Sequence, residues 1–125
     1  MILSIGTDLA EVLRIQDAHT RFGDRFLRRV FTAGEIAYSM RKANKHERLA
    51  ARFAAKEALM KAIGTGLTRG VSWQDIEVVN LPSGKPTLRL TGQAAIHAER
   101  LGTRLIHLSL THTATMAMAV VVLEA

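Results

Sequence analysis

The sequence contains no cysteine, few aromatic residues and no long apolar run. Without cysteine, neither a disulfide framework nor a zinc-thiolate site is possible, and a reducing compartment suits such a chain. No apolar stretch approaches the roughly 18 residues of a membrane span, and the start lacks the basic and apolar regions of a signal peptide. We therefore expect a soluble, cytoplasmic protein without a membrane partner.

Acidic residues are fewer than basic ones, and the net charge is +6. Most of this charge lies in residues 1–61, which carry +5 of it. Such a chain could bind nucleic acid, an acidic protein or a phosphorylated small molecule, or the charge could simply solvate its surface. A nucleic-acid-binding module is one alternative, but aromatic residues for base stacking make up only 5% of the chain and no such motif occurs. We therefore do not expect a nucleic-acid partner.

The length and hydrophobic content suit one domain with one core. The chain has 125 residues, of which 48% are hydrophobic. No repeat, linker or low-complexity segment divides it, so we expect a single domain over residues 1–125. Strands at both ends and helices between them predict an α+β fold, with an antiparallel sheet and a long central helix.

Periodicity and capping signals predict the individual elements. They are a strand over 2–10; helical segments over 12–30, interrupted near Gly23; a short helix over 36–40 behind the capping box Thr32/Glu35; a long helix within 47–66, stopped by Gly64 and Gly66; strands over 71–80 and 87–90; a helix over 92–101 capped by Thr91; and a hairpin of 105–111 and 116–123. The expected inward residues of the region 12–30 are Leu13, Phe22, Phe26 and Val30. Tyr38 and Trp73 are interpreted as packing residues.

Asp8 stands at the end of the first predicted strand. Alternation places it on one face with the small residues Ser4, Gly6 and Ala10. An ionised carboxylate at the end of a mostly apolar strand needs a charged partner or a metal ion, because removing a charge from water is costly. Asp8 is therefore a candidate functional residue.

The long helix carries two polar edges. Glu57 and Lys61 lie on one edge, four residues apart, whereas Arg48, Arg52 and Lys56 form the other. An ordinary ion pair between residues four apart is one interpretation of the first edge.

The alternative interpretation is a metal site. Because the helix is rich in alanine, the first strand could approach it closely, so that Asp8 and Glu57 share one Mg²⁺ beside a phosphate. Free backbone N–H groups of the segment Gly64–Gly66 could also contact that phosphate. Sequence alone leaves both interpretations open.

Four stretches together resemble a known family. The segments "IGTDLAEVLRI", "RFAAKEALMKAIGTG", "GKP" and "HLSLTHTATMAMAVVV" have the order and spacing of bacterial holo-acyl-carrier-protein synthases, the 4′-phosphopantetheinyl transferases of fatty-acid biosynthesis. The resemblance spans nearly the whole chain. It implies the fold of that family and transfer of phosphopantetheine from coenzyme A to a serine of apo-acyl carrier protein, with release of adenosine 3′,5′-bisphosphate. It also implies a homotrimer whose active sites lie between subunits.

The resemblance assigns roles to the acidic edge. Asp8 and Glu57 match the residues that bind Mg²⁺, and Lys61 matches the lysine that contacts the coenzyme A phosphates. The serine must also lose a proton. Glu57, directly or through a metal-bound water, is our first choice of base, and Asp8 is the alternative. A Mg²⁺-dependent hydrolase of another diphosphate is a competing hypothesis.

The resemblance also indicates where the two substrates bind. Arg14 matches an arginine that contacts the carrier protein, and Arg25 and Arg29 are its expected companions. The nucleotide end of coenzyme A is expected at Arg52 and at the turn Gly84–Pro86. His107 is expected near the nucleotide, although a lone histidine on a strand is more often structural.

Overall fold

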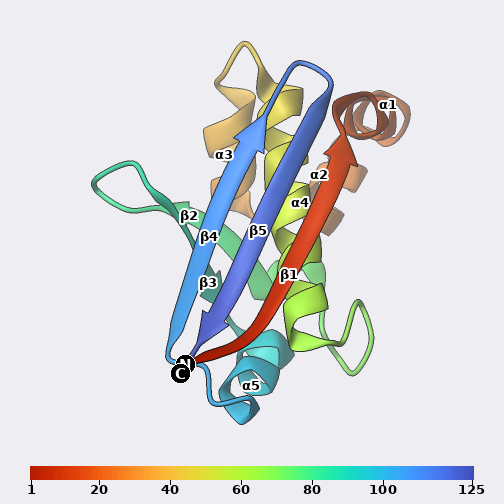
Figure 1. Cartoon of the computed structure of the whole chain (residues 1–125). Helices are drawn as coiled ribbons and strands as arrows, with labels where there is room; N and C mark the ends of the chain where they lie inside the picture. Colours follow the sequence, from red (N-terminus) through yellow and green to blue (C-terminus); the bar gives the residue numbers. More distant parts are fainter.

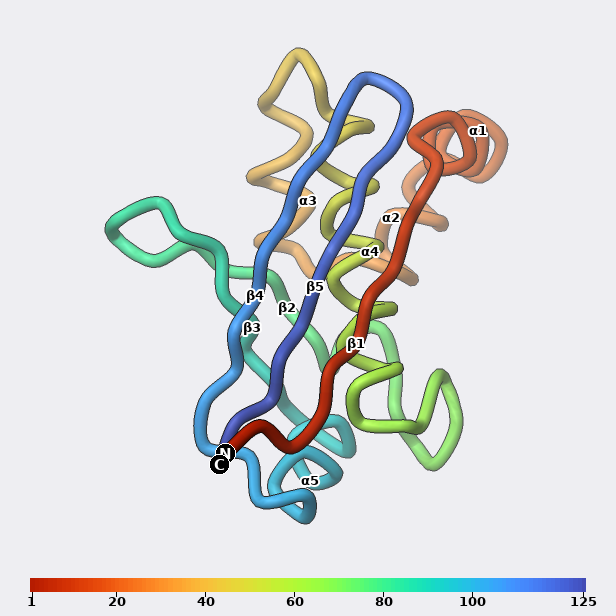
Figure 2. The backbone as a smooth tube through the Cα atoms, viewed as in Figure 1, coloured from red at the N-terminus to blue at the C-terminus, as the bar shows by residue number.

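The first strand and the C-terminal hairpin form one antiparallel sheet. The computed structural model describes all 125 residues. In this sheet β5 (Met116–Glu124) lies between β1 (Ile2–Glu11) and β4 (Leu105–His112). Figure 2 shows the two termini side by side at one end of the sheet, where the amide of Ala125 donates to the carbonyl of Met1 at 3.0 Å. The predicted α+β class, the first strand and the hairpin are therefore confirmed.

One long helix covers a single face of this sheet. α4 (Lys45–Ile63) packs against β1 and β5, while the opposite face carries no helix (Figure 1). Apolar residues of α4 join two buried clusters, one beneath the sheet and one beneath the N-terminal helices. The helix ends at Gly64, which adopts a left-handed conformation with φ of 79°. This confirms the predicted stop. No helix of the chain combines the length and the apolar character that a bilayer span requires.

The helical region after β1 consists of three short helices. α1 (Val12–Phe22) and α2 (Asp24–Val30) are separated at Gly23, as predicted, and α3 (Ala33–Met40) follows. The capping box is present, because the amide of Thr32 donates to Glu35 at 2.8 Å and Thr32 Oγ1 accepts from the Glu35 amide. Since this box fixes the first turn, α3 begins at Ala33 rather than at residue 36.

The predicted inward face of α1 is wrong at two positions. Leu13 is 61% exposed and Phe22 is 53% exposed, whereas Val12 and Ile15 are buried. The amide of Val12 donates to the carbonyl of Thr115 at 2.9 Å, and this bond sets the rotation with which the helix leaves the sheet. Phe26 and Val30 in α2 do contact the core, as expected.

The strand predicted over 71–80 is too long. A 3₁₀ turn, η1 (Trp73–Asp75), lies in its first half, and only β2 (Ile76–Asn80) is extended and pairs antiparallel with β3 (Pro86–Leu90). The Ser72 amide donates to the Asp75 side chain at 3.2 Å, which closes the turn and interrupts the extended backbone. α5 (Gly92–Arg100) follows β3 at the predicted place, although the Thr91 side chain does not cap it.

Candidate active site

β1 and α4 touch through their backbones at Gly6. A Cβ atom on Gly6 would lie 2.0 Å from the carbonyl oxygen of Ala58 and 2.9 Å from the amide of Ala62, so only glycine permits this approach. One turn further along the helix, Ser4 Oγ donates to the carbonyl of Ala62 at 2.7 Å. The face of small residues predicted from the sequence is thus the face that meets the helix.

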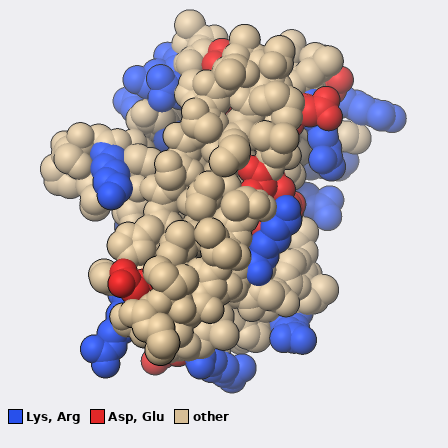
Figure 3. Space-filling model, in the orientation of Figure 1, with Lys and Arg blue, Asp and Glu red and all other residues tan.

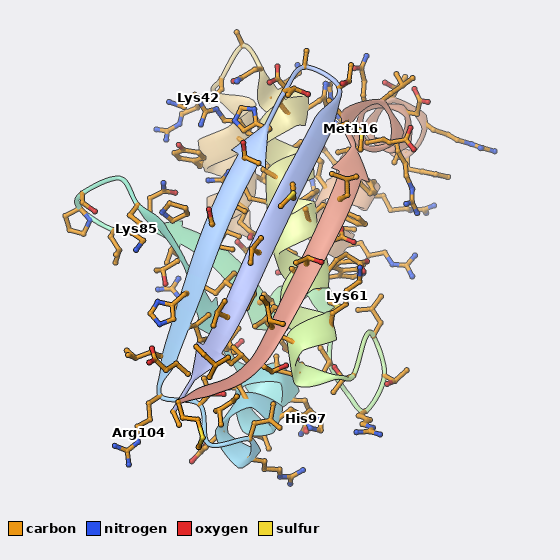
Figure 4. The ribbon with its side chains drawn as sticks, in the orientation of Figure 1. Lys42, Lys61, Lys85, His97, Arg104 and Met116 are labelled. Carbon is orange, nitrogen blue, oxygen red and sulfur yellow. The ribbon has the colours of Figure 1, made fainter.

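This contact brings Asp8 and Glu57 into one half-buried site. Burial raises the pKa of Glu57, and the negative charge of Asp8 raises it further, while Lys61 and Arg14 oppose these effects. Lys61 Nζ donates to Asp8 Oδ1 at 3.1 Å and to the carbonyl of Thr7 at 3.0 Å. Figure 4 shows Lys61 at the outer edge of β1, where 54% of its side chain is exposed. The site therefore combines two carboxylates with one ammonium group that solvent can reach.

The donor set of this site fits Mg²⁺ in the presence of a phosphate ligand. The chain holds no group of three or more histidine and acidic side chains that could enclose an ion by themselves. Mg²⁺ usually needs only one or two carboxylates, because substrate phosphates and water complete its coordination. A cation would also relieve the repulsion between Asp8 and Glu57 that raises the pKa of Glu57.

Only one of the two glycines after α4 has a backbone N–H group free for a phosphate. The amide of Gly64 donates to the carbonyl of Met60 at 2.9 Å, because this residue closes the helix, and it is not free for a phosphate. Gly66 has a φ of 55°, its amide makes no backbone hydrogen bond, and a Cβ there would meet open space. Of the predicted pair, Gly66 alone can offer its N–H group.

A groove of about 560 Å³ adjoins the acidic site. All three predicted carrier-binding arginines, Arg14, Arg25 and Arg29, contribute to it, and Arg14 acts electrostatically on Glu57. Its lining is mainly apolar and includes Phe22, Phe53 and Trp73. The rings of Phe53 and Trp73 stack with centroids 5.2 Å apart. The interpretation of Trp73 as a packing residue overlooked that it also forms a wall of this groove.

A second cavity, of about 180 Å³, brings together Arg52, Gly84 and Pro86, the residues at which the resemblance places the nucleotide end. The guanidinium of Arg52 lies 4.3 Å from the centroid of the Tyr38 ring, and Arg52 donates to Asn80 Oδ1 at 3.3 Å. The Nε atom of Arg52 is buried and has no hydrogen-bond partner within the protein. A buried donor without a partner, in a cavity that also contains Arg48, suits an anionic ligand.

His107 does not lie in this cavity. Its Nε2 atom is 2.7 Å from Glu124 Oε1. The histidine among the lining residues is His112, whose Nδ1 is 3.0 Å from Glu47 Oε1. Five residues of a strand span about 17 Å, so the two histidines of β4 lie near opposite ends of the strand. His112, in the segment "THT", was not among the site residues predicted from the sequence.

Comparisons with known proteins show the family to which the chain belongs. The model of the 4′-phosphopantetheinyl transferase superfamily matches residues 4–119. The holo-[acyl-carrier-protein] synthase of Solibacter usitatus is 64% identical over 124 residues, which are 99% of both chains.

Two crystal structures are similar over almost their full length. The holo-[acyl-carrier-protein] synthase of Neisseria meningitidis has a TM-score of 0.90 and 34% identity, with 100% of both chains covered. The Bacillus anthracis enzyme, solved in complex with CoA (3′,5′-ADP), has a TM-score of 0.81 and 38% identity, covering 100% of this chain and 98% of the other. The chain therefore belongs to the 4′-phosphopantetheinyl transferase superfamily, among its holo-[acyl-carrier-protein] synthases.

Proposed function

We propose that this protein transfers the 4′-phosphopantetheine group of coenzyme A to a serine of an apo-acyl carrier protein, with Mg²⁺ as cofactor and adenosine 3′,5′-bisphosphate as the leaving product. The arrangement along α4 carries this proposal. Arg52 contributes to the basic cavity, Phe53 to the apolar groove, and Glu57 and Lys61 to the acidic site. One helix thus presents a site for a nucleotide, a surface for a protein and a centre for phosphoryl chemistry.

The lining of the groove is evidence that the acceptor is an acidic, helical carrier protein. Exposed Arg14, Arg25 and Arg29 surround apolar side chains, so an amphipathic partner with acidic residues would find both an apolar floor and opposite charges. Because Arg14 acts on Glu57, a carrier bound there would present its serine near the acidic site.

The second cavity supports binding of the nucleotide end of coenzyme A. Arg52 brings a buried, unpaired N–H group, and Gly84 and Pro86 form part of the wall. We assign His112, rather than His107, to this end because it is the histidine of the cavity. Binding of CoA (3′,5′-ADP) by the Bacillus anthracis relative is in line with this assignment.

In the proposed reaction, each residue of the acidic site has its own role. The serine oxygen forms a bond to the β-phosphorus of coenzyme A, and the bond from that phosphorus to the bridging oxygen breaks. Mg²⁺ held by Asp8 and Glu57 would supply positive charge beside the diphosphate. Lys61 already donates to Asp8 and Thr7 and keeps a third proton for a phosphate oxygen.

The serine proton needs an acceptor in the same site. Glu57 is our choice, because its carboxylate lies in the half-buried site and, unlike that of Asp8, accepts no hydrogen bond from Lys61. Asp8 is the alternative, although its Oδ1 atom already accepts a hydrogen bond from Lys61.

We also propose that the chain forms a homotrimer through the open face of the sheet. Ile5, Leu9 and Met118 are exposed there. Figure 3 shows this face as an almost continuous uncharged surface, with charged groups mostly at its edges. An apolar sheet face of this kind is typical of an interface between subunits.

One assay tests the proposed transfer. The protein is mixed with an apo-acyl carrier protein, coenzyme A and Mg²⁺, and the carrier is weighed by mass spectrometry. We expect a phosphopantetheine adduct that disappears with a chelator and with Asp8→Ala, whereas Glu99→Ala on α5 is the control that removes an exposed acid elsewhere. Turnover of coenzyme A without a carrier would favour the hydrolase instead, and an active Asp8→Ala variant would refute the metal assignment.

A further inference from the structure

Lys56 is a charged residue buried completely inside the protein. Its side chain is 0% exposed, and its ammonium group has three partners: Glu35 Oε1 at 2.7 Å, the carbonyl of Trp73 at 3.0 Å and the carbonyl of Ile76 at 2.5 Å. A protonated lysine has three N–H donors, so every one of them is used within the protein. The ammonium group is therefore unavailable to a substrate.

Glu35, the ionic partner, is equally buried and equally well connected. Its Oε1 atom accepts from the amide of Thr32 at 2.8 Å, and its Oε2 atom accepts from the amide of Val78 at 2.8 Å. The pair thus joins three elements through directional bonds: α4 through Lys56, the start of α3 through Thr32, and the segment 73–80 through Val78 and the two carbonyls.

The segment 73–80 leads to both substrate sites. At its start, Trp73 stacks on Phe53 of α4 in the wall of the apolar groove. At its end, Asn80 accepts from Arg52 and donates to the carbonyl of Gly84 at 3.0 Å in the wall of the nucleotide cavity. Lys56 binds this segment at its start, through the carbonyl of Trp73, and near its middle, through the carbonyl of Ile76.

A contribution to stability alone is a weak explanation for such a pair. Desolvation of two buried charges often outweighs their attraction, and well-packed apolar residues of similar volume can be as stable or more so. An apolar pair, however, makes no directional hydrogen bonds. It would therefore not fix the positions of two carbonyl groups and an amide relative to α4.

We propose that Lys56 and Glu35 are positioning residues that hold the segment 73–80 at a fixed height along α4, and so set the width of both substrate sites with one buried ion pair. This inference rests on the proposed function, because it assigns the groove to the carrier and the cavity to the nucleotide. Neither residue touches a substrate in this arrangement.

Two variants separate positioning from stability. Lys56→Met leaves Glu35 buried without its ionic partner, and Lys56→Met/Glu35→Gln removes both charges at similar volume. We expect Lys56→Met to lower the unfolding midpoint and to raise the KM for coenzyme A and for the carrier by roughly tenfold each, with kcat changed less. We expect the double variant to regain stability but to keep both raised KM values.

The fluorescence of Trp73 gives a readout that does not depend on transfer. It is the only tryptophan in the chain, and its carbonyl is bonded to Lys56. We expect both variants to show red-shifted emission and greater acrylamide quenching, because the indole loses its fixed stacking on Phe53. Leu123→Ala, at a fully buried position near the C-terminal end of β5, is the destabilised control, with unchanged KM values and emission.

The possible outcomes can be told apart. If the unchanged protein does not modify the carrier, the proposed function fails, while the fluorescence still tests the positioning. If transfer is normal and the double variant regains its KM values together with its stability, the pair is only structural and the inference is overturned.

Discussion

Gly6 determines how closely β1 can approach α4, and with it how closely Asp8 can approach Glu57. Because its Cβ would meet backbone atoms of Ala58, a larger residue must push β1 away from α4. We expect Gly6→Ala to destabilise the protein by about 1–3 kcal/mol, the usual cost of overpacking. We also expect it to slow transfer by roughly 100-fold, since a shift of about 1 Å can cost that much. Chemical denaturation and the mass-spectrometric assay measure the two effects.

Ser4→Ala is the matched control for Gly6→Ala. It lies on the same face of β1 and removes one hydrogen bond to Ala62 without adding any atom to the contact. We expect it to cost about 1 kcal/mol and to leave transfer almost unchanged. A Gly6→Ala variant that transfers at the normal rate would show that the close approach does not position Asp8.

Single residues show what the sequence could and could not predict about the site. Asp8 and Glu57 could be found, because the small face of β1 and the alanines of α4 both favour close contact. Lys56 could not be recognised as buried, because its spacing from Arg48 and Arg52 resembles a solvated edge. Its partner Glu35 comes from another helix, and helical periodicity contains no information about such a partner.

At the level of elements, α1 and α2 carry Arg14, Arg25 and Arg29, the cations of the groove that we propose for the carrier. Arg14→Ala should raise the KM for the carrier several-fold and leave the KM for coenzyme A unchanged. The increase should be greater at low salt, because salt screens exposed charges over about 10 Å at 0.1 M. Steady-state rates at two ionic strengths measure this. Arg104→Ala, at the opposite end of the molecule in Figure 4, removes the same charge as a control and should change neither value.

A pair of histidines connects α1 to the start of α4. His19 Nδ1 and His46 Nε2 lie 2.9 Å apart, so one ring donates and the other must accept in its neutral form. Burial lowers the pKa of His46 from 6.5, and His19 and Lys45 lower it further. The unfolded chain therefore binds a proton more readily than the folded one, and stability falls as the pH drops through 6.5 towards the lower folded-state pKa.

Thermal unfolding at about pH 7.5 and about pH 5.5 tests this histidine pair. The unchanged protein should lose stability on acidification, and His46→Gln should lose less because no imidazole remains to be protonated at that position. The separate contact between His112 and Glu47 is present in both proteins and serves as a common background. Equal losses in the two proteins would exclude His46 as the source.

The elements themselves were predictable where local signals decide them. Three such signals are the break at Gly23, the capping box at Thr32 and the stop at Gly64. Each is a residue type at the very helix end that it determines, so the sequence shows it directly. The rotation of α1 was not predictable, because a bond from Val12 to Thr115, about 100 residues away, sets it. The 3₁₀ turn at Trp73–Asp75 was missed because Val71–Asn80 reads as one continuous strand.

For the whole molecule, the open sheet face is the feature that a single chain leaves unexplained. Ile5 is 62% exposed although it lies in the middle of β1, opposite Val122 of β5. The alternating pattern of the strand has apolar residues on both faces, and α4 accounts for only one of them. An exposed sheet face with several large apolar residues is typical of an interaction surface, which is why we propose that a second subunit covers it.

If the chain associates through this face, a single charge introduced there should prevent assembly. Ile5→Asp would bury a carboxylate in the proposed interface, so the trimer should dissociate at concentrations where the unchanged protein stays assembled. Light scattering after gel filtration should give three times the 13.7 kDa chain mass for the unchanged protein and one chain for the variant. Leu101→Asp places the same charge at an apolar residue, 44% exposed, away from the sheet, and should remain trimeric.

If Ile5→Asp keeps the mass of the trimer, the sheet face is not the interface. If instead it becomes monomeric and also loses transfer, while circular dichroism shows that it is still folded, the active site depends on a neighbouring subunit.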